Sequence, residues 1–171
     1  MAKDGQVRRP KAQIDVKELE PNLLNPDFVD FLQSIHASRV ESILVGGYAV
    51  VLHGYLRTTG DLDLWVRPTA ANYRRLRQAF ATFGLPTDAI SEKDFLAPEQ
   101  RDVFTFGRPP VAIDILTHVK GLEFEAAFGM AEMVRVDGAP LRLLHLNHLK
   151  QAKKAAGRHK DLDDLEHLPD Q

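Results

Sequence analysis

The chain has 171 residues, a formal net charge of −2, 44% hydrophobic residues and no cysteine. This length fits one domain with its own core, and the missing cysteines exclude disulfides, zinc–thiolate sites and cysteine nucleophiles. The slightly acidic balance excludes a uniformly basic surface, so any polyanion would have to bind a local basic patch.

The N-terminal residues 1–13 are polar and mildly basic. We expect them to form a flexible tail ahead of a single domain over residues 14–171. The tail has no apolar segment of the kind that secretory signals carry. No apolar run elsewhere approaches the roughly 20 residues that span a membrane. The sequence therefore predicts a cytoplasmic protein without membrane contact.

Hydrophobic periodicity and turn residues predict the order of helices and strands. The N-terminal half is predicted to contain a helix from 26 to about 35, a strand at 42–45, a short helix at 47–53, a strand at 62–66 and a helix from 68 to 83. The C-terminal half is predicted to contain a helical turn at 92–96, strands at 102–106, 111–116, 131–136 and 141–144, and helices at 123–128, 146–156 and 160–167. This order indicates an α+β domain with a mixed sheet, closed by a C-terminal helical pair over residues 144–168.

The stretch 43–66 carries the strongest signals of a functional site. An apolar run ends at Gly46 and Gly47, a short helical run follows, and a second apolar run contains Asp61 and Asp63. An acid within a strand is costly to bury unless it has a partner or a function. These acids therefore need a chemical explanation.

Side chains alternate along a strand, so Asp61 and Asp63 share one face and the leucines between and after them share the other. Two carboxylates about 7 Å apart along a strand can bind one hard cation or share two. Asp114 is a lone acid in the apolar strand at 111–116. If the two strands are neighbours, the three acids converge as candidate catalytic and metal-binding residues for two-metal phosphoryl transfer. Asp114 is also the candidate proton acceptor.

The pair Gly46-Gly47 lies between a predicted strand and a predicted helix. Glycine lets a phosphate approach the backbone closely, and the N-terminus of a helix offers free N–H donors. We therefore expect this turn to hold the triphosphate of a nucleotide. The alternative is that the pair forms only a tight turn.

Together these features resemble the polymerase-beta-like nucleotidyltransferase superfamily, with its glycine pair, short helix, Asp-x-Asp and distant strand acid. The finer pattern Arg57, Thr59, Asp61 and Asp63, with the run at 153–162, is similar to small bacterial members related to AbiEii-type toxins. The similarity covers roughly residues 41–66, 111–116 and 146–168. Many superfamily members have Gly-Ser where this chain has Gly-Gly, which would leave the grip on phosphate to backbone N–H groups.

The resemblance implies a mixed β-sheet nucleotidyltransferase core flanked by helices. It implies transfer of a nucleoside monophosphate from a nucleoside triphosphate (NTP) to an acceptor, with Mg²⁺ as cofactor and two ions expected. It favours the 3′ end of a tRNA as acceptor and a toxin role, with an antitoxin protein as partner. Other acceptors remain open, namely other RNA, a protein hydroxyl or a small molecule such as an aminoglycoside. A non-catalytic member that binds a nucleotide or a partner protein is the remaining alternative, although the presence of all three acids argues against it.

Lys153 lies on the apolar stripe of the helix predicted at 146–156. A lysine on an inward face usually has an anionic partner. That partner is either an acid such as Asp161 or the triphosphate, where the lysine would neutralise developing charge.

The candidate nucleotide-binding residues are thus Gly46, Gly47, Arg57, Thr59 and Lys153. Arg57 is also a candidate for orienting the acid-bearing loop through a carboxylate. Thr59 is also a candidate for a hydrogen bond within that loop.

Overall fold

The computed structural model describes residues 17–19, 22–108 and 110–170, so the predicted tail at 1–13 lies outside the described residues. The described residues form seven strands and seven helices in an α+β fold. The strands are β1 (Lys17–Glu18), β2 (Ser42–Val45), β3 (Asp61–Val66), β4 (Val103–Arg108), β5 (Val111–Leu116), β6 (Glu132–Val136) and β7 (Ala139–Leu143). The helices are α1 (Pro26–Ala37), α2 (Gly46–Leu52), α3 (Ala70–Phe83), α4 (Glu92–Phe95), α5 (Phe124–Met130), α6 (Leu146–Ala156) and α7 (His159–His167).

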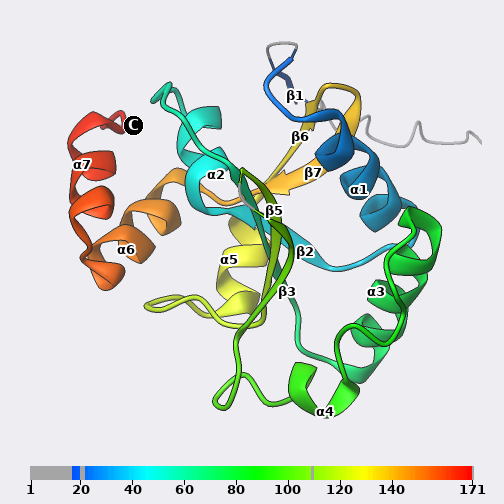
Figure 1. Cartoon of the computed structure of the whole chain (residues 1–171). Helices are drawn as coiled ribbons and strands as arrows, with labels where there is room; N and C mark the ends of the chain where they lie inside the picture. The colour runs from blue at the N-terminus through cyan, green and yellow to red at the C-terminus, as the bar shows by residue number, and fades with distance from the viewer. Residues whose placement is uncertain (1–16, 20–21, 109, 171) are drawn as a thin grey trace, which may run out of the picture.

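The described strands form one mixed sheet in the order β1-β6-β7-β2-β3-β5-β4. Strand β3 has β2 antiparallel on one side and β5 parallel on the other. The pairs β4–β5 and β6–β7 are antiparallel, whereas β2 and β7 are parallel. Figure 1 shows α1 and α3 together at one side of the molecule and the α6–α7 pair at the opposite side. The candidate functional site lies between the central strands and this C-terminal pair.

The two faces of the central strands have different neighbours. On the leucine face of β3, the ring of Phe106 packs against Phe80 of α3 at 5.2 Å between centroids, and Phe80 in turn lies 6.3 Å from Phe31 of α1. On the acid face, the buried Trp65 packs edge-on against Phe124 of α5 at 5.1 Å. The leucine face of the central strands is therefore covered by α1 and α3. The carboxylates lie on the opposite face, which α2 and α5 approach.

Most predicted elements occur within one or two residues of their predicted bounds. Asn25 is the N-cap of α1, since its side chain accepts a hydrogen bond from the Asp27 N–H at 2.9 Å. Strand β1 was not predicted, because its two residues are too few to show an alternating pattern. Within the described residues, none of the helices combines the length and the apolar character needed to cross a membrane.

The turns left between the predicted strands, at 107–110 and 137–140, are shorter in the structure than in the prediction. The turn predicted at 107–110 loses its first two residues to β4, because Gly107 and Arg108 pair with β5. The turn predicted at 137–140 consists of Asp137 and Gly138 alone, with φ of 49° and 82°. Two consecutive left-handed residues are typical of a tight hairpin turn, and β7 therefore begins at Ala139, earlier than predicted.

Candidate functional site

Asp63 on β3 and Asp114 on β5 lie side by side, because they are register partners on neighbouring parallel strands. The prediction that these two strands are neighbours is thus confirmed. Asp61 lies on the same face of β3, opposite Ala112, where burial and then the Asp61 charge raise the pKa of Tyr48. Among the described residues, no three Asp, Glu or His side chains are arranged as a ready-made metal site. The fold therefore pairs two of the three acids and places the third further along the same face.

The environment of Asp63 disfavours its charged form. Burial, followed by the negative charges of Asp114 and Asp61, raises the pKa of Asp63 from 3.8 to about 7. A hydrogen bond to Asp114 acts in the same direction, and the positive charge of Lys153 opposes it. Adjacent carboxylates in such surroundings are stabilised by a shared proton or by a cation. The pair is therefore a position where a divalent cation would relieve electrostatic repulsion.

Neighbouring side chains approach the backbone at Gly46 and Gly47 so closely that a residue with a Cβ would not fit at either position. Gly46 has φ of 67°, and a Cβ there would overlap the Asp63 carboxylate, lying 2.8 Å from its Cγ. A Cβ at Gly47 would overlap the Thr59 hydroxyl and lie 3.0 Å from the Thr59 Cβ. The glycine pair thus lets the start of α2 pack directly on the acid strand and on the loop before it.

Replacing Gly46 by Ala is expected to lower the free energy of unfolding by about 3 kcal/mol, because both overlap with Asp63 and left-handed backbone strain oppose the new Cβ. Gly138→Ala is the matched control, since Gly138 has φ of 82° and nothing within 4 Å of its Cβ position. The control should lose only about 1 kcal/mol from backbone strain. Urea denaturation measures both, and equal losses would mean that Asp63 does not crowd Gly46.

A buried ion network holds α6, α7 and the loop before β3 together. Lys153 Nζ lies 3.1 Å from Asp161 Oδ1 and 2.8 Å from Asp164 Oδ2. Arg57 binds Asp164 with two hydrogen bonds, at 2.6 Å from Nε and 2.9 Å from Nη2. Arg158 Nε lies 2.8 Å from Asp161. Three cations thus surround two carboxylates that are almost completely buried, so the network carries a net positive charge.

This network bears on two of the alternatives left open by the sequence. Lys153 makes the structural ion pair with Asp161, and its contact with a triphosphate stays a prediction. Arg57 is engaged with the carboxylate of Asp164, which is the loop-orienting arrangement. Thr59 lies against Gly47, on the same loop as Arg57.

A cavity of about 330 Å³ lies between the acid pair and the C-terminal helices. It brings together four predicted site residues, namely Gly46, Asp63, Asp114 and Lys153. The other four do not line it: Asp61, Gly47, Arg57 and Thr59. Its wall also contains three residues that the sequence did not single out, namely His118, Lys120 and Arg158. The cavity lining therefore carries the carboxylates of Asp63 and Asp114, two further carboxylates from Asp102 and Asp161, and basic side chains from both the loop after β5 and the C-terminal helices.

The residue of the network that sequence reasoning missed most clearly is Asp164. Its carboxylate is completely buried and binds both Arg57 and Lys153. The available signal was its spacing of three residues from Asp161, which places both acids on one face of a helix. The Arg158 side chain is 73% exposed, and it also lines the cavity.

The raised pKa of Asp63 predicts a pH-dependent stability. Because its pKa is about 7 in the folded chain and near 3.8 when unfolded, the folded chain retains a proton that the unfolded chain releases between these values. Its contribution to stability is therefore lost as the pH rises from about 4 to about 7. Asp63→Asn removes this loss, so without divalent metal the variant should exceed the wild type by up to about 4 kcal/mol at pH 8.

Chemical denaturation of both proteins at pH 5 and pH 8 in the presence of a chelator measures this difference. The advantage of Asp63→Asn should be about 1.5 kcal/mol at pH 5, where only the unfolded chain has released the proton, and about 4 kcal/mol at pH 8. An advantage that is the same at both values would contradict the assigned shift.

Comparison of the sequence with protein-family models and with curated proteins gives no match.

Proposed function

We propose that this protein is a metal-dependent nucleotidyltransferase of the polymerase-beta-like kind. It transfers a nucleoside monophosphate from an NTP to an acceptor and releases pyrophosphate. The observation that carries this proposal is the pairing of Asp63 and Asp114 on adjacent parallel strands, facing a cavity that Gly46 and Lys153 also line. Paired strand carboxylates beside a glycine turn and basic side chains are what metal-assisted phosphoryl transfer requires.

The donor set at the acid pair fits a hard divalent cation such as Mg²⁺. Both donors are carboxylates, and carboxylate oxygens are the ligands that Mg²⁺ prefers. The raised pKa of Asp63 supports the fit, because the charged pair lacks sufficient positive compensation of its own. Asp63 and Asp114 would hold the cation, and Asp61 is the candidate third ligand, with two ions expected. When bound, such ions neutralise phosphate oxygens and favour ionisation of the attacking hydroxyl.

The remaining residues of the cavity bind and orient the triphosphate. Gly46 presents backbone without a side chain beside Asp63. Lys153 is fixed by two carboxylates, so its ammonium group is already positioned before substrate arrives. Arg158 and Lys120 add positive charge on the same wall. Asp114, which accepts a hydrogen bond from the Thr105 hydroxyl at 2.6 Å, is the proposed proton acceptor.

Two cations beside the acid pair support a polyanionic acceptor. Lys120 and Arg158 line the cavity outside the acid pair, among the further acids Asp102 and Asp161, and phosphate groups of RNA are the acceptor chemistry that such cations favour. We propose RNA, with the 3′ end of a tRNA as the first acceptor to test. The similarity of Arg57, Thr59, Asp61 and Asp63 to AbiEii-type toxins supports the further proposal of a toxin role held in check by an antitoxin protein.

The test is incubation of the purified protein with each α-³²P-labelled NTP, Mg²⁺ and either total tRNA or cell lysate. We expect label in RNA, and we expect Asp63→Ala to remove it. Label in the protein fraction would show that the acceptor is a protein and would contradict the proposal that it is RNA. Saturable nucleotide binding without transfer to any fraction would contradict the proposed transferase activity and favour the non-catalytic alternative.

A further inference from the structure

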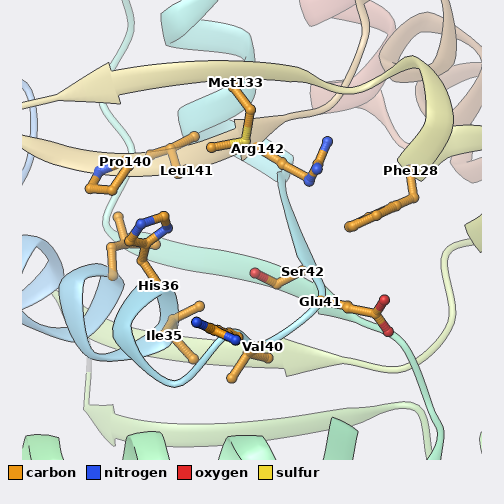
Figure 2. A pocket seen from close by; sticks show the side chains of 12 residues that line it. Ile35, His36, Val40, Glu41, Ser42, Phe128, Met133, Pro140, Leu141 and Arg142 are labelled. Carbon is orange, nitrogen blue, oxygen red and sulfur yellow. The ribbon is translucent and has the colours of Figure 1, made fainter. Parts of the chain in front are cut away.

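A second cavity, of about 250 Å³, lies away from the acid pair. Figure 2 shows it between the end of α1, strands β6 and β7, and Phe128 of α5. Ser42, the first residue of β2, lines this cavity, whereas Val45, the last residue of the same strand, lines the cavity with the acids. The two cavities are therefore at opposite ends of β2, and a ligand site in the second one is independent of the proposed function.

The floor and walls of this second cavity are mainly apolar. They are formed by the side chains of Leu32, Ile35, Val40, Phe128, Met133 and Leu141. Figure 2 shows the labelled members of this set, from Ile35 to Leu141, arranged around a common space, with the hydroxyl of Ser42 directed toward it. An apolar cavity with a few polar groups at its edge is typical of a small-molecule site. Its volume is below the roughly 300 Å³ at which drug-sized sites begin, so it suits a smaller ligand.

The polar groups at its edge are mostly basic. Arg142 and Arg39 line the cavity, and neither forms an ion pair within the described part of the chain. The Arg142 guanidinium lies over the Phe128 ring at 4.2 Å from its centroid. Glu41 is the acid in the lining, and its carboxylate is engaged with Arg67 Nε at 2.8 Å. Two arginines thus line the cavity without a carboxylate partner in the described part of the chain.

The backbone at Arg39 is strained. It has φ of 57° immediately after Ser38, the C-cap of α1, where its N–H donates to His36 O at 3.0 Å and the Val40 N–H donates to Ile35 O at 3.1 Å. Glycine is the usual residue at this left-handed position, and another residue costs about 1 kcal/mol. Strain of this kind is often retained where the side chain has a function. At this position, the strained residue is one of the two arginines that line the cavity.

We infer that this cavity binds a small organic anion that has one compact apolar group, such as an aryl-substituted short-chain carboxylate. The apolar group would occupy the space between Ile35, Leu141 and Phe128. The carboxylate would meet the guanidinium groups of Arg39 and Arg142, which bind planar oxyanions with paired hydrogen bonds.

The test is a ¹⁵N-resolved NMR titration of the full chain with 3-phenylpropionate, and with 3-phenylpropanamide as its neutral analogue. We expect saturable shifts of the Ser42 and Leu141 amides, no shift at Gly46 or Asp63, and at least about tenfold weaker binding of the neutral amide. Absence of saturable shifts up to about 10 mM, equal binding of acid and amide, or shifts confined to the acid site would overturn the inference.

Three variants test whether the arginines that line the cavity are responsible for binding. Arg142→Gln should weaken binding about tenfold, and Arg75→Gln, an exposed arginine on α3, should leave it unchanged. Arg39→Gly should weaken binding while raising the melting temperature, because it removes both the guanidinium and the backbone strain. The same spectra report whether each variant is folded. Wild-type affinity in both Arg142→Gln and Arg39→Gly would overturn the inference.

Discussion

Asp114→Asn is expected to lower nucleotidyl transfer by about a thousandfold, equivalent to about 4 kcal/mol of transition-state stabilisation. The change removes one of two adjacent carboxylates and the proposed proton acceptor. It keeps a side-chain oxygen that can still accept the hydrogen bond from Thr105. Single-turnover assays with a labelled NTP measure the rate, and thermal denaturation shows that the variant is folded.

Asp102→Asn is the matched control for this variant. Asp102 also lies at the cavity, next to edge strand β4, but it is not a register partner of Asp63. Its rate should stay within about threefold of wild type, because a screened charge away from the reacting groups contributes little. A comparable loss in both variants would show that total negative charge matters and that the Asp63–Asp114 pair has no special role.

Asp164→Asn is expected to lower the free energy of unfolding by about 3 to 5 kcal/mol. Burial alone would raise the pKa of Asp164, but hydrogen bonds from Arg57 and then Lys153 outweigh it and lower the pKa below 3.8. Its stabilising charge is therefore present above about pH 4 and is lost as the pH falls further. The neutral amide leaves two cations at a fully buried position with less compensation.

Asp163→Asn provides the control on the same helix. The exposed Asp163 accepts a hydrogen bond from the Tyr55 hydroxyl at 3.0 Å, and its loss should cost less than about 1 kcal/mol. Urea denaturation at pH 7 measures both variants. If Asp164→Asn were no more destabilising than Asp163→Asn, the buried network would not be what fastens α7 to the rest of the chain.

The shared face of Asp61 and Asp63 could be predicted because it depends on a local rule. Alternation along β3 placed Asp61 and Asp63 on one face, and the apolar runs on either side of each acid identified the strands. Which strand lies next to β3 was a hypothesis, and the register confirms it. The spacing along one strand could not show that Asp114 would lie opposite Asp63 and away from Asp61. That choice depends on a parallel register set by the whole sheet.

The ion network could be predicted only in part. The helical stripe of α6 correctly placed Lys153 on a buried face. Its second partner, Asp164, depends on the angle between α6 and α7, which Gly157 sets with φ of 66°. Apolar periodicity gives no guide on α7, because Leu162 is 48% exposed while Asp161 and Asp164 are buried. The inward face of this helix is acidic, and its partners come from distant segments of the chain.

The transferred group is the most direct test of the proposed reaction. Wild-type protein is incubated with Mg²⁺, total tRNA and the same NTP labelled with ³²P at either the α or the γ phosphate. Transfer of a nucleoside monophosphate predicts that α-label enters the acceptor and that γ-label is recovered as pyrophosphate, with both products absent in Asp63→Ala. Label from the γ phosphate in the acceptor, or α-label transfer that persists in Asp63→Ala, would contradict the proposal that Asp63 and Asp114 form a nucleotidyltransferase site.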